Sequence, residues 1–314
     1  MTQTDADLLL LFAGSCLLLV LASLVGMVLQ SQLSPNTDNP TVETYLTRVR
    51  TWWVMVLLMT LALLTGRIGI VVLFLFCSFA ALREFLTLTT KTKGDHMSLV
   101  AIFYVVLPAQ YVMIWLGESG LFSILIPVYA FLLLPIVSVL RQPDQKFLAR
   151  VSETQWALMI CVYCLSHVPA LLTLDIPGYQ NRVVLLVAFL VLVVQLSDLM
   201  EYYVGRRFGR RSIAPRVSPK TWEGVGAGTL TAALIGFVLN WITPFAPHEA
   251  ALMAIAIFLI GSGGSVVLAA IKRDLGVRDW GHLIPGQGGF VDKMDSAIFA
   301  APVFYHLTAY FWSV

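Results

Sequence analysis

Ten apolar runs fill most of this chain, and nearly all of them are long enough to cross a lipid bilayer. A helix rises about 1.5 Å per residue, so about 20 apolar residues cover the roughly 30 Å of hydrocarbon in a membrane. The runs cover residues 8–29, 51–65, 68–82, 98–116, 121–140, 153–173, 183–200, 224–242, 249–271 and 296–313. We therefore predict an all-α, polytopic integral membrane protein with about ten transmembrane helices, of which the second and third are short enough to form a re-entrant pair.

The composition supports a membrane protein and excludes two other classes. Of the 314 residues, 58% are hydrophobic and 12% are charged, and the mean hydropathy is +0.83. A soluble domain has about a quarter of its residues charged, so a soluble globular enzyme and a disordered chain are both excluded. We find no repeat or hydrophilic linker, and we expect one transmembrane domain over 1–314, with N-terminal spans in 1–182 and a C-terminal part, 183–314, that carries the polar motifs.

The positive charges gather on one side of the predicted membrane. When alternate connections are compared, 18 of the 20 Lys and Arg residues fall on one side, and only Arg67 and Arg182 fall on the other. Positive residues collect on the cytoplasmic side of membrane proteins. We therefore expect the connections after residues 200 and 271 to face the cytoplasm, both termini to face the opposite side, and the protein to lie in the cell membrane, the inner membrane of a bacterium. The first run follows Asp5 and Asp7 and lacks a cleavage site, so we interpret it as a retained helix.

The first polar connection holds six cations between Arg206 and Lys220. Attraction to anionic lipid headgroups is one explanation for such a run. However, glycines at positions 205 and 209 permit close backbone approach, and Ser218–Thr221 lies just before a helix start, a geometry that suits phosphate oxygens.

Acidic residues lie at the membrane ends of both polar connections. Asp198 and Glu201 end the span before the first connection, where an acid usually has a function or a partner, here the neighbouring arginines. Asp292 and Asp295 share one helix face if the last span has begun there. Two carboxylates beside cations suit a hard cation such as Mg²⁺. Favourable charge at a helix N-terminus is the alternative, and we prefer the metal.

Several smaller features complete the candidate site. The Gly261–Ser265 run in the ninth span favours close helix packing over an unwound stretch that lines a cavity. The glycine turn around Gln287 can face an anion or simply lead into the last span, and His282 is a candidate contact. All four cysteines lie inside predicted spans, which indicates packing rather than a disulfide or zinc site. The sequence contains no Walker loop, HExxH, GxSxG or GxGxxG.

Together the two polar connections resemble those of the phosphatidate cytidylyltransferase family, also called CDP-diacylglycerol synthases. The first similarity comprises Asp198, Tyr202, Gly205, Phe208-Gly209, Pro215, Ser218-Pro219, Lys220-Thr221 and Glu223-Gly224. The second comprises Lys272-Arg273, Arg278-Asp279, Gly281–Gly286, Gly288-Gly289 and Asp292–Ser296. The similarity covers about the last 120 residues.

This resemblance implies an all-helical membrane enzyme with a cytoplasm-facing polar cavity, which transfers CMP from CTP to phosphatidate or a related lipid phosphate and releases pyrophosphate. The protein contributes mainly positioning and charge neutralisation to such a transfer. Implied partners are CTP, a phosphatidate-like lipid, membrane lipids and a second copy in a homodimer, without nucleic acid; Mg²⁺ is the implied cofactor. The implied metal ligands are Asp292, Asp295 and Ser265, the implied catalytic residues are Lys272, Arg273 and Lys220, and the implied substrate contacts are Asp198, Ser218, Thr221, Arg206, His282 and Gln287.

The sequence departs from the family pattern at several positions. Ser265 stands where the family has Asp, Ala269 where it has Ser, Gln287 where it has His and Lys293 where it has Arg, and the Ser-Pro…Lys-Thr turn is one residue short. A neutral Ser weakens the binding of a hard cation, and Lys lacks the bidentate fork of Arg. These changes put catalytic competence in question but not the fold.

Two other functions stay open at this point. One is a non-catalytic member that binds nucleotide or anionic lipid or supports a partner enzyme, having lost its metal site at Ser265. The other is a transporter, which ten spans and a glycine-interrupted helix would suit. The polar residues, however, cluster at one face of the membrane rather than at its midplane, which argues against transport.

Overall fold

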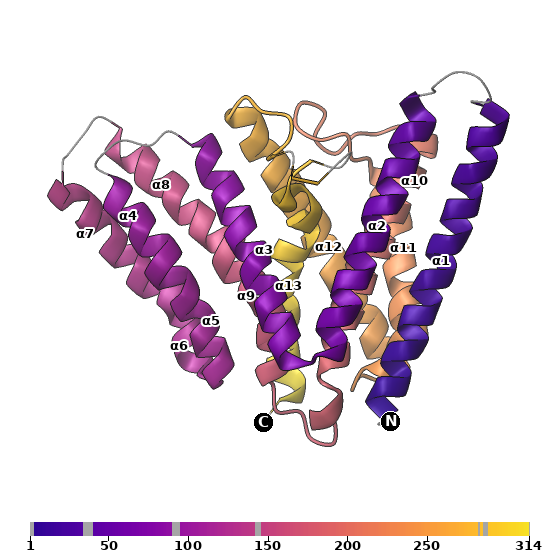
Figure 1. Ribbon diagram of the computed structural model, residues 1–314, viewed down its shortest axis with the longest axis horizontal. Coiled ribbons are helices and arrows are strands. Elements are labelled where there is room, and N and C mark those ends of the chain that lie inside the picture. Colours follow the sequence, from indigo (N-terminus) through magenta and orange to yellow (C-terminus); the bar gives the residue numbers. More distant parts are fainter. Residues whose placement is uncertain are drawn as a thin grey trace.

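Helices account for every element longer than a single bridge in the described part of the chain (Figure 1). The computed structural model describes residues 3–33, 40–89, 95–141, 146–281, 283–284 and 288–313. The predicted all-α class is therefore confirmed.

The N-terminal half contains three uninterrupted helices and three that include a π-helical stretch. The uninterrupted helices are α1 (Gln3–Leu33), α2 (Pro40–Leu64) and α3 (Arg67–Leu88). The others are α4 (His96–Ala101) continuing through Ile102–Val106 into α5 (Leu107–Leu116), α6 (Ser119–Ile124) through Leu125–Ala130 into α7 (Phe131–Arg141), and α8 (Phe147–Leu158) through Met159–Cys164 into α9 (Leu165–Ala170) and the turn Leu171–Thr173.

The described residues of the C-terminal half form four long helices. These are α10 (Val184–Phe208), α11 (Trp222–Val238), α12 (Pro247–Asp274) and α13 (Phe290–Trp312), with short 3-10 turns at Gln180–Arg182 and Leu239–Ile242. The last helix joins the two halves, because α13 packs against α3 and α9 as well as against α10 and α12.

Nine helical stretches of the described chain are long and apolar enough to cross a membrane. The tenth predicted span corresponds to α13, which has 23 residues and therefore measures about 34 Å. Its first two turns hold Asp292, Lys293 and Asp295, and its later turns hold Pro302, His306 and several aromatic residues, so α13 is less apolar than the other spans. The fold is that of a polytopic membrane protein.

The prediction that the second and third spans form a re-entrant pair is wrong. The structure extends them to Val42–Leu64 and Arg67–Leu88, each long enough to cross. A tight turn joins them at Gly66, whose positive φ of 67° suits glycine. Both runs looked short because Arg48, Arg83 and their charged neighbours lie inside the helices rather than beyond them.

Both chain termini lie at one end of the bundle, and the α10–α11 and α12–α13 connections lie at the other (Figure 1). We call this second end the charged end, because residues 206–220 and 272–293 supply half of the Lys and Arg residues. The arrangement agrees with the predicted alternation of the connections.

Small residues allow α11, α12 and α13 to pack closely. A Cβ atom on Gly228 would lie 2.2 Å from the Phe258 ring, and one on Gly264 would lie 2.1 Å from Phe299. Helix α12 is continuous through the Gly261–Ser265 run. The predicted packing role is therefore confirmed, and the run holds α12 close against α13 at the charged end.

The cysteines belong to this packing. All four are free, as expected, and Cys77 and Cys161 are buried in the apolar core. The core continues from α3 across α9 and α10 to α13, so the charged end rests on a closely packed base.

Candidate active site at the charged end

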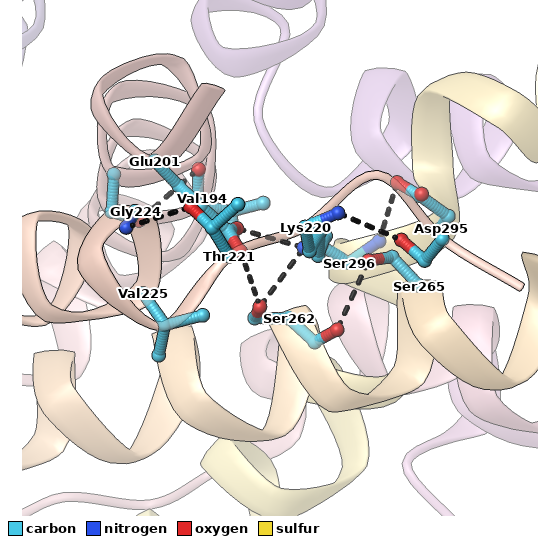
Figure 2. A network of polar contacts seen from close by, with 12 residues as sticks. Val194, Glu201, Lys220, Thr221, Gly224, Val225, Ser262, Ser265, Asp295 and Ser296 are labelled. Atoms are coloured by element: carbon cyan, nitrogen blue, oxygen red, sulfur yellow. Dashed lines mark hydrogen bonds and ion pairs between the residues drawn. The ribbon is translucent and has the colours of Figure 1, made fainter. Parts of the chain in front are cut away.

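A buried ion pair links the first polar connection to two helices. The Lys220 ammonium donates to Oε2 of Glu201 on α10 over 2.7 Å and to Oγ of Ser262 on α12 over 2.9 Å. The Ser262 hydroxyl in turn donates to Oε1 of Glu201 over 2.9 Å. Figure 2 shows the three side chains converging from three separate elements. The predicted alternative for Glu201, pairing with neighbouring arginines, is wrong, since its partner is Lys220.

The backbone of the α10–α11 connection holds Lys220 in this position. The Ile213 amide donates to the Lys220 carbonyl oxygen over 3.0 Å, and the Lys220 amide donates to Oγ of Ser218 over 3.3 Å. Thr221 caps α11 by accepting a bond from the Gly224 amide over 3.2 Å. Ser218 and Thr221 thus shape the turn around Lys220 in this structure, and substrate contact by either remains a prediction.

A second ion pair joins α12 to α13. Lys272 Nζ donates to Asp292 Oδ1 over 2.7 Å. The other oxygen, Oδ2, accepts bonds from the backbone amides of Trp280 and Gly289 at 2.9 and 3.0 Å. Asp292 therefore serves as an N-terminal cap of α13, the alternative that the sequence ranked second. Metal binding by Asp292 would require these contacts to be exchanged and stays untested.

Two further carboxylates, Asp198 and Asp295, lie beside these ion pairs. Both interact electrostatically with Lys220 and with each other, and Asp198 also interacts with Glu201 and the Ser296 hydroxyl. Asp295 Oδ1 accepts a bond from the Ser296 amide over 2.8 Å. Asp198 Oδ1 is buried without a hydrogen-bond donor. In Figure 2, Lys220 lies between Glu201 and Asp295.

The charges of this cluster favour an additional cation. We define the carboxylate–lysine cluster as Asp198, Glu201, Lys220, Lys272, Asp292 and Asp295. It contains four carboxylates and two lysines. The lysine side chains are 18% and 21% exposed, more than their carboxylate partners at 5% and 10%. An incoming polyanion can therefore reach the lysines, and the buried, unpartnered oxygen of Asp198 leaves negative charge that a bound cation would neutralise.

The described residues contain no preformed group of three or more His, Cys, Asp or Glu side chains that could hold a metal. The pair Asp198 and Asp295 still suits a Mg²⁺ ion that shares its ligands with substrate phosphates, because such ions take only one or two protein carboxylates. Ser265 lies one helical turn after Ser262 on α12, and its hydroxyl donates to the Ser262 carbonyl oxygen over 3.0 Å.

Four other predicted site residues lie outside the cluster or outside the described chain. Arg206 is exposed and donates to the Tyr202 hydroxyl over 2.9 Å. Arg273 is exposed on the last turn of α12. The structure brings neither into the carboxylate–lysine cluster. Arg206 lies on a different face of α10 from Glu201, and Arg273 lies on a different face of α12 from Lys272. His282 and Gln287 lie outside the described residues.

Sequence reasoning missed Glu84 on α3, which supports the site from the N-terminal half. Its side chain is buried, and Oε2 accepts a bond from the Val291 amide in the first turn of α13 over 3.2 Å. Next to it, Phe85 stacks on Trp280 with ring centroids 4.7 Å apart. The usable signal was an acid at the end of an apolar run, which needs a partner. Our predicted span ended at residue 82, so Glu84 was left outside it.

Comparison with known proteins agrees with this geometry. A sequence profile of the cytidylyltransferase family matches residues 46–311. The chain is 35% identical over 295 residues to the protein named uncharacterized protein YnbB of Escherichia coli K12, covering 93% of this chain and 95% of that protein. It is 28% identical over 221 residues to the phosphatidate cytidylyltransferase of Bacillus subtilis 168, covering 68% and 78%. A Haemophilus influenzae phosphatidate cytidylyltransferase is 36% identical over 131 residues, covering 38% and 44%. Because the profile spans well over half of its length, this chain belongs to the cytidylyltransferase family.

Proposed function

We propose that this protein transfers CMP from CTP to phosphatidate or a closely related lipid phosphate, at the cytoplasmic face of a bacterial inner membrane. One observation carries the proposal: α10, the α10–α11 connection, α12 and α13 bring the carboxylate–lysine cluster together at the end of a membrane bundle. A triphosphate needs cations and a lipid phosphate needs a membrane boundary, and this position offers both.

The reaction forms one bond and breaks one. A phosphate oxygen of the lipid attacks the α-phosphorus of CTP, the α–β phosphoanhydride bond breaks, and pyrophosphate leaves with the bond's electron pair. Lys220 and Lys272 neutralise charge on the phosphates, exchanging part of their bonds to Glu201 and Asp292 for bonds to the substrate. These carboxylates keep the two ammonium groups in position before substrate arrives.

A divalent cation belongs to this proposal as cofactor. Asp198 and Asp295 would hold it, and a bound Mg²⁺ would supply positive charge that stabilises the substrate phosphates. Asp198 contributes the buried carboxylate oxygen that lacks a donor. We assign Ser265 a weaker, neutral contact, because its hydroxyl carries no charge to match a hard cation.

The second candidate function is a catalytically silent member that binds CTP or anionic lipid. The hydroxyl at Ser265 favours it, since this position holds an Asp in the pattern the sequence resembles. The ion pairs of the cluster would then serve binding only.

The decisive experiment is an assay of the purified protein in detergent with radiolabelled CTP, phosphatidate and Mg²⁺, read as CDP-lipid and pyrophosphate. We expect turnover that Asp295→Asn reduces by at least about 100-fold, the scale of losing one charge-stabilising group. Asp274→Asn, an exposed acid at the end of α12, is the matched control and should keep wild-type turnover.

If no CDP-lipid forms in this assay, the proposed enzymatic activity is rejected, and binding of CTP or phosphatidate then decides about the second candidate. CTP binding without turnover supports the silent member, and turnover gained in Ser265→Asp would locate its defect. Absence of binding to both CTP and phosphatidate-containing vesicles, in a protein that unfolds cooperatively on heating, would reject both candidates.

A further inference from the structure

A partly open apolar cavity of about 120 Å³ is walled by α1, α2, α3, α9, α10 and α13. A cavity of about 150 Å³ in a protein core accepts a benzene molecule. The space is therefore large enough for part of a hydrocarbon chain. Its lining is apolar apart from Ser15, Thr60 and Gln195, so it offers few partners to a nucleotide or a sugar.

The cavity is long rather than round. Its α2 wall consists of one helix face, formed by Trp52, Met55, Val56, Met59, Thr60 and Leu63. From Trp52 to Leu63 the helix rises about 16 Å. The α1 wall comes from Leu8 to Ser15, in the part of α1 near the chain terminus. The cavity therefore runs from the level of Trp52 and Gln195 toward the end of the bundle that holds the termini.

One end of the cavity adjoins the carboxylate–lysine cluster. Gln195 lines it and lies one helical turn before Asp198 on α10, while Met294 lines it directly before Asp295 on α13. Trp52 lies at the same end, with the Lys293 ammonium 5.7 Å from the centre of its ring. A phosphate held at Asp198 and Asp295 through a cation would thus lie within about one helical turn of this end of the cavity.

We propose that this cavity holds a segment of one acyl chain of the lipid phosphate whose headgroup occupies the active site. The inference rests on the proposed function for its headgroup. Hydrocarbon tails gain little by leaving a bilayer for an equally apolar pocket. The cavity therefore acts by positioning: a chain seated along α2 fixes the depth and direction of the phosphate that must attack CTP.

The test fills the cavity and compares lipids of different chain length. Thr60→Trp places a bulky ring on the α2 wall, toward the end of the cavity that lies away from the carboxylate–lysine cluster. Leu61→Trp is the matched control, since the neighbouring side chain is 59% exposed and does not line the cavity. Ser15→Trp fills the same space from α1 and guards against misfolding of one variant.

With dioleoyl phosphatidate we expect both filling variants to lower kcat/KM at least about tenfold, because small misplacements of a reacting group cost about that much or more. With dihexanoyl phosphatidate we expect wild-type rates, because Thr60 lies about 12 Å along α2 from Trp52 and six-carbon chains are too short to reach it. Equal losses in Thr60→Trp and Leu61→Trp, or equal losses with both lipids, would overturn the proposal.

A second measurement works without turnover. Phosphatidate carrying a diazirine in the middle of one acyl chain is photolysed with the protein, and labelled peptides are mapped. We expect the probe to label Met55 and Met59. Excess unlabelled phosphatidate should prevent this labelling and excess phosphatidylcholine should not. The Thr60→Trp variant should not be labelled at these positions. Equal labelling by a diazirine phosphatidylcholine would mean that bulk lipid fills the cavity, and the proposal fails. Specific labelling without CDP-lipid formation would instead support the cavity and reject the proposed reaction.

Discussion

Two ion pairs at the charged end, Arg150–Asp95 and Lys220–Glu201, differ in their surroundings. Around one pair the nearby carboxylate oxygens all have hydrogen-bond donors, and around the other they do not. Between α4 and α8, Arg150 Nε donates to Asp95 Oδ2 over 2.9 Å and Ser138 donates to Oδ1 over 3.1 Å, with both charged side chains at most 8% exposed. In the carboxylate–lysine cluster, Lys220 Nζ lies 2.7 Å from Glu201 Oε2. They have two further carboxylates beside them, one with an unpartnered oxygen.

This difference distinguishes an ion pair that only joins helices, Arg150–Asp95, from a group of charged side chains that can still bind a ligand, the carboxylate–lysine cluster. Each Asp95 oxygen already has a donor from the protein, and little of the pair reaches solvent. The cluster has acceptors left over and lysines that are partly exposed. Buried charge alone therefore does not identify an active site, and an incompletely satisfied set of charges is the better indicator.

The largest effect, a loss of stability, should come from breaking the Arg150–Asp95 ion pair. Arg150→Met leaves Asp95 buried without its cation, which costs about 3–5 kcal/mol of stability. Thermal and denaturant unfolding in detergent measure this loss. Activity per folded molecule should stay at the wild-type level. A stable Arg150→Met protein with lost activity would assign this pair to the site and cancel the distinction.

The next effect, in activity rather than stability, should come from Lys220→Met. Removing a cation that meets developing phosphate charge is expected to lower kcat about 100- to 1,000-fold. Because the variant also leaves Glu201 unpaired, the double variant Lys220→Met/Glu201→Leu is the control. It should regain thermal stability without regaining activity. Recovery of both would mean that Lys220 only joins helices, as Arg150 does.

A smaller loss of activity than in Lys220→Met is expected for Glu84→Gln. The neutral side chain still accepts a bond from the first turn of α13 but no longer places a negative charge at that helix N-terminus. We expect the kcat of CDP-lipid formation to fall about fivefold, about 1 kcal/mol, with KM for phosphatidate unchanged. Glu118→Gln, an exposed acid outside the charged end, should match wild type. A loss of stability without a change in kcat would reduce Glu84 to a packing residue.

The sequence predicted the helical class, the alternation of charged connections and the packing role of the Gly261–Ser265 run, because each depends on local composition or spacing. It also selected Asp198, Lys220, Asp292 and Asp295, which the structure brings to one end of the bundle. Residue type and motif spacing were sufficient to find them.

The partners within the site could not be predicted in the same way. Pairing of Lys220 with Glu201 and Ser262 depends on how three elements meet in space. Helix geometry would have corrected one residue, since Arg206 lies five residues after Glu201 and about 140° away around α10. Glu84 contacts a segment more than 200 residues later, a distance that no local pattern encodes.

The smallest effect is expected for Arg206→Gln, which tests the exposed cations against the buried ones. Arg206 donates to Tyr202 on the surface of the charged end and does not enter the cluster. It can attract CTP only through solvent, so we expect KM for CTP to rise about twofold at low ionic strength and to match wild type near 0.5 M salt, where the screening length is only about 4 Å. Arg207→Gln, on the neighbouring exposed side chain, should behave alike. A salt-independent loss of kcat in Arg206→Gln alone would show that the guanidinium turns inward when substrate binds, and the division between surface and cluster would have to be redrawn around it.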